Sequence, residues 1–187
     1  MKEIRNLADS KISADDSRTV EGYAVIFNSE SRDLGGFNEI IEKDALNGII
    51  DKSDVFCYLN HDDKRGVLAR SNKGKGSLCL EIDEVGLRYA FEAPKTALGD
   101  ELLEGIRRGD ISASSFAFTC GEDKWEKRAD GTYLRHITNI KALYDVSPVY
   151  TPAYDATSVD TRGLDELKDA EKKELDIYYK ELEDKLK

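Results

Sequence analysis

The sequence predicts an α+β domain built on a mainly antiparallel sheet, β-barrel-like in form, with a few flanking helices. Three observations lead to this prediction. The chain has at least six strand-like runs, neighbouring runs alternate apolar and polar side chains in hairpin fashion, and only two stretches of the main body are helix-like. With 187 residues the chain is long enough to bury one substantial core. A doubly wound parallel sheet is disfavoured, because strands and helices do not alternate regularly.

The first part of the chain predicts two strands and a short helix. Residues 1–18 show no clear pattern and are expected to be poorly structured. Residues 19–28, TVEGYAVIFN, are rich in β-branched and aromatic side chains, which predicts a strand. Residues 36–50 carry apolar side chains at helical spacing and predict a short helix. Residues 54–63, DVFCYLNHDD, predict a buried strand that ends abruptly in polar residues.

A hairpin and the strongest helix follow. Residues 76–83 and 86–94 both alternate apolar and polar side chains and are joined by a short link, so they predict two paired strands. Residues 96–110 predict an α-helix with an apolar stripe. Thr96 can cap its first turn and Gly109 can end it.

The last part of the body predicts more strands. Residues 114–120, 132–142 and 143–150 are all strand-like, and residues 122–131 predict a polar loop that contains an Asp-Gly turn. Together with the earlier runs, these segments complete the predicted sheet.

Composition changes at the end of the chain. We expect an N-terminal segment at 1–18, the main domain at 19–155, a linker at 156–163 and a charged C-terminal helix at 164–187. The helix has one discontinuous apolar stripe, made of Leu164, Leu167, Leu175, Tyr178, Leu182 and Leu186. A stripe of this kind needs a partner. That partner is the main domain itself, a second copy of the chain or another helical protein.

Charge and cysteine content exclude several classes of function. The net charge of −10 disfavours a nucleic-acid partner. Cys57, Cys79 and Cys120 are odd in number and widely spaced, so we expect reduced, mostly buried thiols and no zinc site. No segment is apolar enough to be a signal peptide or to span a bilayer, so we expect a cytosolic protein without a membrane partner. No motif calls for a metal or a cofactor.

A serine cluster is the strongest candidate for chemistry. The stretch GDISASSFAF at 109–118 carries it between the predicted helix and a strand. A serine hydroxyl needs an adjacent base, and His61, at the exit of a buried strand, is the better placed of the two histidines. Asp145 is a single acid in an otherwise apolar strand, so it could orient the imidazole. The residues alone leave open whether these groups meet or whether His61 is structural.

The chain resembles the tailed-bacteriophage prohead proteases, which mature the capsid. The matching pieces occur in the family's order over roughly residues 20–155: GYAVIFN, FNEIIEKDAL, NHD, GSLCLEIDEVGLRYAFEAP, GDELLEGIRRGDIS with SSFAF, and DVSPVYTPAY. The resemblance implies a fold similar to the herpesvirus assemblins, which are serine proteases with a β-barrel ringed by helices. It also implies that Ser115 is the nucleophile, His61 the base and Asp145 the acid.

The chain departs from the family pattern at two points. Ala117 stands where glycine is usual, and the SAS at 112–114 lacks the glycine often found there. Two rival assignments also remain. Ser114 is an adjacent hydroxyl, and His136 could be the third member because assemblins use a second histidine in that role.

The resemblance therefore implies a Ser-His-Asp serine endopeptidase that needs no cofactor. Its expected place is inside the immature prohead in the cytoplasm of the bacterial host. The expected substrates are the scaffold protein, the scaffold-like N-terminal segment of the major capsid protein, and the protease itself. We expect backbone amides near Ser115 to hold the oxyanion, and the C-terminal helix to allow self-association. The alternatives are a non-catalytic capsid-assembly protein that retains the fold, and a small-molecule hydrolase.

Overall fold

The computed structural model describes residues 1–7, 10–14, 17–150 and 162–185. Its strands are β1 (Glu3–Leu7), β2 (Ser13–Ala14), β3 (Thr19–Ile26), β4 (Phe37–Ile41), β5 (Asp54–Cys57), β6 (Ala69–Asn72), β7 (Lys75–Gly76), β8 (Cys79–Ile82), β9 (Gly86–Glu92), β10 (Ile111–Lys127) and β11 (Tyr133–Tyr150). Its α-helices are α1 (Ala97–Arg108) and α2 (Arg162–Lys185), and two short 3₁₀ helices are η1 (Lys43–Leu46) and η2 (Asp63–Arg65).

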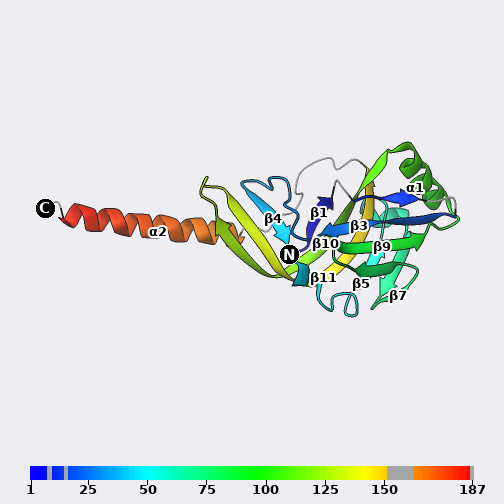
Figure 1. Cartoon of the computed structure of the whole chain (residues 1–187), viewed down its shortest axis with the longest axis horizontal. Coiled ribbons are helices and arrows are strands. Elements are labelled where there is room, and N and C mark those ends of the chain that lie inside the picture. The colour runs from blue at the N-terminus through cyan, green and yellow to red at the C-terminus, as the bar shows by residue number, and fades with distance from the viewer. Residues whose placement is uncertain (8–9, 15–16, 151–161, 186–187) are drawn as a thin grey trace.

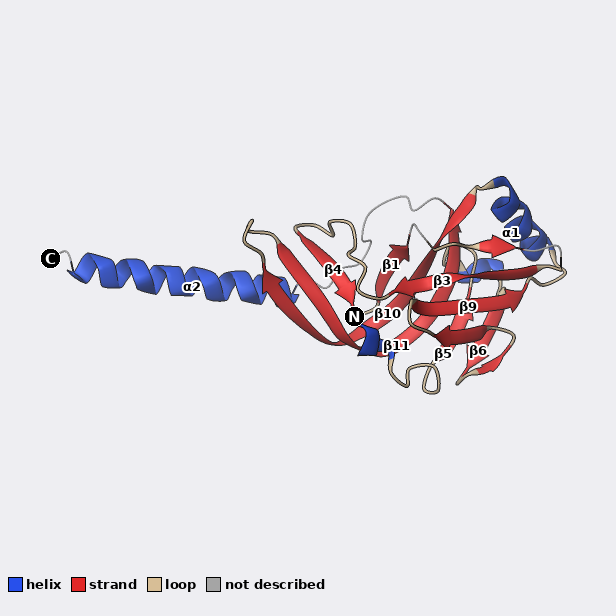
Figure 2. Ribbon diagram, viewed as in Figure 1, coloured by secondary structure: helices blue, strands red, loops and turns tan. Residues whose placement is uncertain are grey.

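The strands form two sheets, and Figure 2 shows the strands and helices in one view. One has seven strands in the order β1-β10-β11-β5-β6-β7, with β4 also paired to β11, and the other has the order β2-β3-β9-β8. Most pairs are antiparallel, but β11 pairs in parallel with β4 and β5. The α+β class is therefore confirmed. The barrel-like expectation is only partly met, because the described strands form two sheets and no closed barrel.

One apolar core joins the two sheets and α1. It takes Val20 from β3, Tyr89 from β9, Leu102 from α1 and Phe118 from β10, all of them fully buried. β10 and β11 form a long hairpin that runs through the molecule, with α1 near one end and α2 beyond the other (Figure 1). Because β10 and β11 lie inside the larger sheet, their side chains hold fixed positions relative to β1 and β5.

The predicted strands and helices at 19–28, 54–63, 76–94 and 96–110 are confirmed in outline. In α1 the hydroxyl of Thr96 accepts a hydrogen bond from the Gly99 N–H, and Gly109 ends the helix in a left-handed conformation with φ 81°. Glycine adopts that conformation without the steric cost of a Cβ.

The predicted helix at 36–50 is wrong. The segment forms β4, followed by the one-turn η1. Phe37 and Ile41 are four residues apart, a spacing that suits a helix face as well as one face of a strand. In the structure these two side chains and that of Glu39 are buried on one face of β4, while β4 pairs in parallel with β11. The sequence allowed either a helix or a strand here, and pairing with β11 selects the strand.

Two segments expected to lack regular structure are strands. The predicted loop at 122–131 is largely an extension of β10, and the chain turns only between Lys127 and Tyr133. The segment at 1–18, expected to be poorly structured, contains β1 and β2, and β1 pairs with β10 over its whole length. The linker predicted at 156–163 lies mostly outside the described residues.

In the described part of the chain, the first turns of α2 contact the body. Leu164 is buried against Phe37 and Tyr133, and Glu171 receives hydrogen bonds from Lys127 and Tyr133. Beyond that point α2 extends away from the body (Figure 1), and its exposed apolar side chains are Leu175, Ile177, Tyr178, Tyr179 and Leu182. None of the described helices is long and apolar enough to cross a membrane.

Candidate active site

Adjacent strands bring the serine and the carboxylate together. In the β10–β11 hairpin, Ser115 lies opposite Ser147, and Ala117 lies opposite Asp145. Asp145 is also the point at which β11 pairs in parallel with Phe56 of β5. Since alternate residues of a strand share a face, Ser115 and Asp145 project from the same side of the larger sheet.

His61 reaches this side through a tight turn after β5. Leu59 is fully buried and anchors the turn, and the N–H of Asn60 donates to the carbonyl of Pro148 on β11 at 2.9 Å. Asn60 and His61 both have left-handed backbones, with φ 55° and 59°. Two consecutive non-glycine residues in that region are costly and recur at functional sites. The turn directs the imidazole back over β10 and β11.

The three side chains form one continuous chain of polar contacts. Nδ1 of His61 is 2.5 Å from Oδ1 of Asp145, and Nε2 of His61 is 2.5 Å from Oγ of Ser115. An ionised carboxylate only accepts hydrogen bonds, so Nδ1 carries a hydrogen and donates a hydrogen bond to Asp145. In neutral His61, Nε2 then has a free lone pair that faces the serine hydroxyl, which is the tautomer that a general base requires.

The environment of Asp145 keeps its carboxylate ionised. Its side chain is only 2% exposed. Burial by itself would raise the pKa of Asp145. The hydrogen bond and charge of His61, a hydrogen bond from Ser147 and the charge of Lys2 outweigh burial and hold that pKa below its usual value. The Ser147 hydroxyl donates to Oδ1 at 2.9 Å and the Lys2 ammonium lies 3.3 Å from Oδ2. The sequence reasoning missed both groups, although Ser147 follows Asp145 at the same-face spacing of a strand.

Ser115 is fully buried and lies beside β1. Its side chain has no exposed surface, and its Oγ lies 2.8 Å from the carbonyl oxygen of Arg5, to which it can donate. A hydroxyl has a single hydrogen, so donation to Arg5 competes with donation to His61. A hydrogen bond from Ser115 to the Arg5 carbonyl therefore directs the hydroxyl hydrogen away from Nε2 of His61.

The two rival residues lie elsewhere. The Oγ of Ser114 is 2.7 Å from the hydroxyl of Tyr89 inside the core, on the opposite face of β10. His136 has Glu42 at 3.2 Å from Nδ1 and Glu126 at 3.3 Å from Nε2. The described geometry thus brings Ser115, His61 and Asp145 together and leaves Ser114 and His136 in other contacts.

The serine cluster lies within β10 and not, as the sequence had suggested, between a helix and a strand. β10 begins at Ile111, so Ser115 lies inside a strand that is paired on both sides, with Asn6 of β1 and with Ser147 of β11. The fully buried Ala117 lies on the same strand opposite Ile4 and Asp145. Backbone amides of β10 on the β1 side become available to a ligand only if β1 leaves.

The three cysteines are not part of the chain of contacts from Ser115 through His61 to Asp145. All three are free: Cys57 is buried, Cys120 is partly exposed, and Cys79 is exposed, contrary to the expectation of mostly buried thiols. Burial raises the pKa of the Cys57 thiol, and the nearby charge of Asp145 adds to that effect. Across the described ranges, no group of three or more His, Cys, Asp or Glu side chains is arranged to hold a metal ion.

A histidine that bridges a serine hydroxyl and a buried carboxylate is the arrangement of the serine hydrolases. Residues 5–170 match the family of caudovirus prohead serine proteases. Because the match spans most of the chain, the chain belongs to that family, and it is a serine protease of phage capsid maturation.

Among solved structures, the chain is similar to the bacteriophage T4 capsid assembly protease, gp21. The two share 13% sequence identity with a TM-score of 0.45, and the alignment covers 81% of this chain and 99% of that chain. No curated protein gives a significant match.

Proposed function

We propose that this protease is an endopeptidase of the Ser-His-Asp type, with Ser115 as nucleophile, His61 as general base and Asp145 as the group that orients His61. The observation that carries the proposal is the unbroken chain of contacts at 2.5 Å from Ser115 through His61 to Asp145. The low pKa of Asp145 supports it further, because a permanent carboxylate fixes the tautomer of the imidazole.

In the proposed reaction the chain's own residues supply every proton transfer. His61 takes the proton from Ser115 as Oγ attacks the peptide carbonyl, and Asp145 stabilises the imidazolium that forms. His61 then gives the proton to the leaving amine, and water hydrolyses the acyl-enzyme by the reverse sequence of transfers. Backbone N–H groups of β10 near Ser115 hold the oxyanion once β1 has left. No cofactor enters this scheme.

The proposed substrates follow from the family. They are the scaffold protein, the scaffold-like N-terminal segment of the major capsid protein, and the protease itself. The proposed place of action is the interior of the immature prohead in the bacterial host. The exposed apolar side chains of α2 support a role for this helix in association with another copy or another helical protein.

The test is covalent labelling of Ser115 together with cleavage of the co-expressed capsid protein. A fluorophosphonate should modify Ser115 in the intact chain, identified by mass spectrometry, and His61→Ala should abolish the labelling. The matched control is Ser114→Ala, which removes a neighbouring hydroxyl and should leave labelling in place. If Ser115 stays unmodified while capsid cleavage proceeds, the assignment is wrong.

One observation favours a second candidate function. Ser115 has no exposed surface, and its hydroxyl contacts the Arg5 carbonyl of the paired strand β1. A closed site of this kind is expected of a non-catalytic capsid-assembly protein that keeps the protease fold. Under that alternative neither labelling nor capsid cleavage occurs under any condition. Proheads would still require the protein for assembly.

A further inference from the structure

The strand that covers the nucleophile is an edge strand. Among the described strands, β1 pairs with β10 alone, in an antiparallel register that places Asn6 opposite Ser115 and Arg5 opposite Phe116. If β1 is removed, β10 becomes the sheet edge, with Ser115 directly on it. An exposed edge of this kind binds an extended peptide through main-chain hydrogen bonds, while pockets for alternate side chains supply selectivity.

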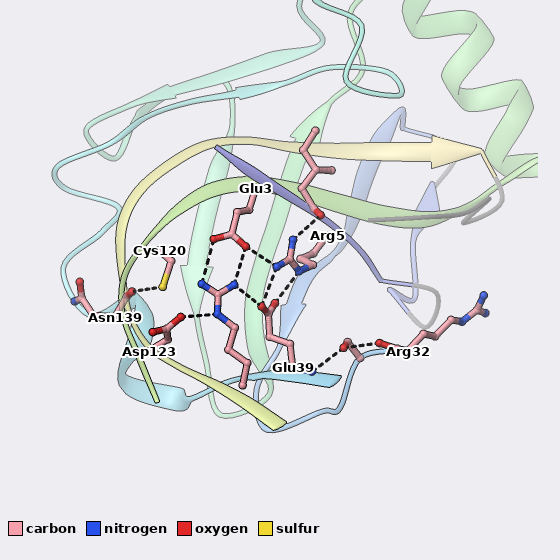
Figure 3. Close-up of polar contacts among 10 residues, drawn as sticks. Glu3, Arg5, Arg32, Glu39, Cys120, Asp123 and Asn139 are labelled. Atoms are coloured by element: carbon pink, nitrogen blue, oxygen red, sulfur yellow. Dashed lines mark hydrogen bonds and ion pairs between the residues drawn. The ribbon is translucent and has the colours of Figure 1, made fainter. Parts of the chain in front are cut away.

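Buried ion pairs hold β1 in this position. Glu3 and Arg5 project from one face of β1 and are only 1% and 7% exposed. Glu3 accepts hydrogen bonds from Arg135 of β11 at 2.8 and 3.3 Å. Arg5 donates to both oxygens of Glu39 of β4, at 2.8 and 2.9 Å. Figure 3 shows Glu3, Arg5 and Glu39 converging in this network.

The contacts of Arg135 with Glu39 and Asp123 do not involve β1. Arg135 donates to Glu39 at 3.0 Å and to Asp123 at 2.6 Å. The strands that carry Arg135 and Glu39 are paired residue to residue at this point. Departure of β1 would therefore leave a preformed pair of charges beside the free edge of β10, a guanidinium for an acidic side chain and a carboxylate for a basic one.

We propose that Arg135, Glu39 and the edge of β10 form the substrate-strand site, and that β1 is its internal occupant. The substrate is an extended peptide with an acidic side chain two residues before a basic one, the pattern of Glu3-Ile4-Arg5. The acidic side chain binds Arg135, the basic one binds Glu39, and the backbone takes the place of β1 beside Ser115. This proposal deepens the proposed function and rests on it, because it names the substrate class of that same site.

Peptide binding to a non-cleaving form of the full chain tests the proposal. The protein carries Ser115→Ala together with Glu3→Gln and Arg5→Gln, which weaken the internal strand and leave Arg135 and Glu39 in place. The probe is a fluorescent heptapeptide, MKEIRNL, identical to residues 1–7. Its matched control is MKRIENL, which has the same composition and net charge with the two charged residues exchanged. Fluorescence anisotropy measures both affinities.

We expect MKEIRNL to bind at least about tenfold more tightly than MKRIENL, because exchange leaves two buried charges facing like charges. We also expect the Ser115→Ala chain with its native Glu3 and Arg5 to bind the probe more weakly than the weakened chain. Equal affinity for the two peptides would overturn the proposal.

A second measurement avoids the weakened strand altogether. The native chain is given two otherwise identical fusion proteins, one with the Glu-x-Arg order and one with the Arg-x-Glu order, and kcat/KM is compared. Faster cleavage of the first by about tenfold supports the site, and equal rates overturn it. If neither cleavage nor serine labelling occurs, the proposed function is refuted. The peptide-binding experiment still decides whether the substrate-strand site exists.

Discussion

Neighbouring serines in β10 have opposite surroundings. Ser115 faces His61 on one side of the sheet, while Ser114 is buried in the core beside Tyr89. We therefore expect Ser115→Ala to lower cleavage by at least about a thousandfold. Its fold should survive, because Ala fits the strand.

Ser114→Ala is the matched substitution. It should leave turnover near wild type and lower the free energy of unfolding by about 1 kcal/mol, because the buried Tyr89 hydroxyl loses its partner. Cleavage assays and urea titrations of both variants check this pair. The reverse pattern of activity would move the nucleophile to Ser114.

The two candidate orienting groups also differ in their contacts. Asp145 touches His61, whereas His136 lies between Glu42 and Glu126. Asp145→Asn should lower kcat by roughly three to four orders of magnitude, because an amide favours the wrong imidazole tautomer. His136→Gln should stay within a few-fold of wild type. Steady-state kinetics on one substrate distinguishes them, and collapse of the His136→Gln variant alone would support a Ser-His-His arrangement.

The low pKa of Asp145 predicts how stability depends on pH. The carboxylate has a lower pKa in the folded chain than in the unfolded chain. The unfolded chain therefore binds its proton first as the pH falls. The stabilisation by Asp145 is complete above the ordinary pKa of an aspartate, about 3.9, and is lost as the pH falls through the lower folded-state value.

Wild type and Asp145→Asn should consequently differ most in their free energy of unfolding near neutral pH. The difference should shrink as the pH falls below about 3.9 and should vanish only below the lower folded-state pKa of Asp145. A difference that stays constant from pH 7 to pH 3 would mean that the carboxylate makes no such contribution.

At the scale of elements, we expect the position of β1 to control the reactivity of Ser115. Ile4 lies opposite Ala117 in the β1–β10 pair, and opposite residues of an antiparallel pair lie close enough for a disulfide. The double variant Ile4→Cys, Ala117→Cys should form one on oxidation and hold β1 in place beside Ser115.

Fluorophosphonate labelling of Ser115 should then fall at least about tenfold in the oxidised form and return on reduction. The single variant Ile4→Cys is the control for oxidation of the three native cysteines. Equal labelling of the oxidised and reduced double variant would show that β1 need not move.

At the scale of the whole molecule, α2 divides into a docked part and a free part. Leu164 and Glu171 bind the β10–β11 hairpin and β4, whereas the apolar side chains from Leu175 onward are exposed. We expect a chain that ends after Lys173 to keep its stability and its cleavage of a soluble peptide, and to enter proheads poorly.

A chain that ends at Arg162 should lose about 2 kcal/mol of stability, since removal of Leu164 uncovers Phe37. Thermal melts, peptide cleavage and prohead incorporation of the two truncated chains separate these effects. Normal incorporation of the chain that ends after Lys173 would contradict a delivery role for the free part.

Sequence alone determined the elements whose local pattern has one solution. The α1 helix has a capping threonine, an apolar stripe and a terminal glycine, and the β8–β9 hairpin alternates strictly, so each is specified within its own residues. The resemblance also singled out Ser115, His61 and Asp145, which the fold brings together, although their catalytic roles stay a prediction.

The sequence did not predict that β1 and β4 are strands. Only their tertiary contacts determine this. Glu3, Arg5 and Glu39 are charged residues that become buried because partners far along the chain satisfy them, and no local pattern reveals those partners. The same long-range pairing placed β1 across Ser115. Local patterns specify α1 and the β8–β9 hairpin, whereas the placement of β1 beside Ser115 depends on contacts between residues more than a hundred positions apart.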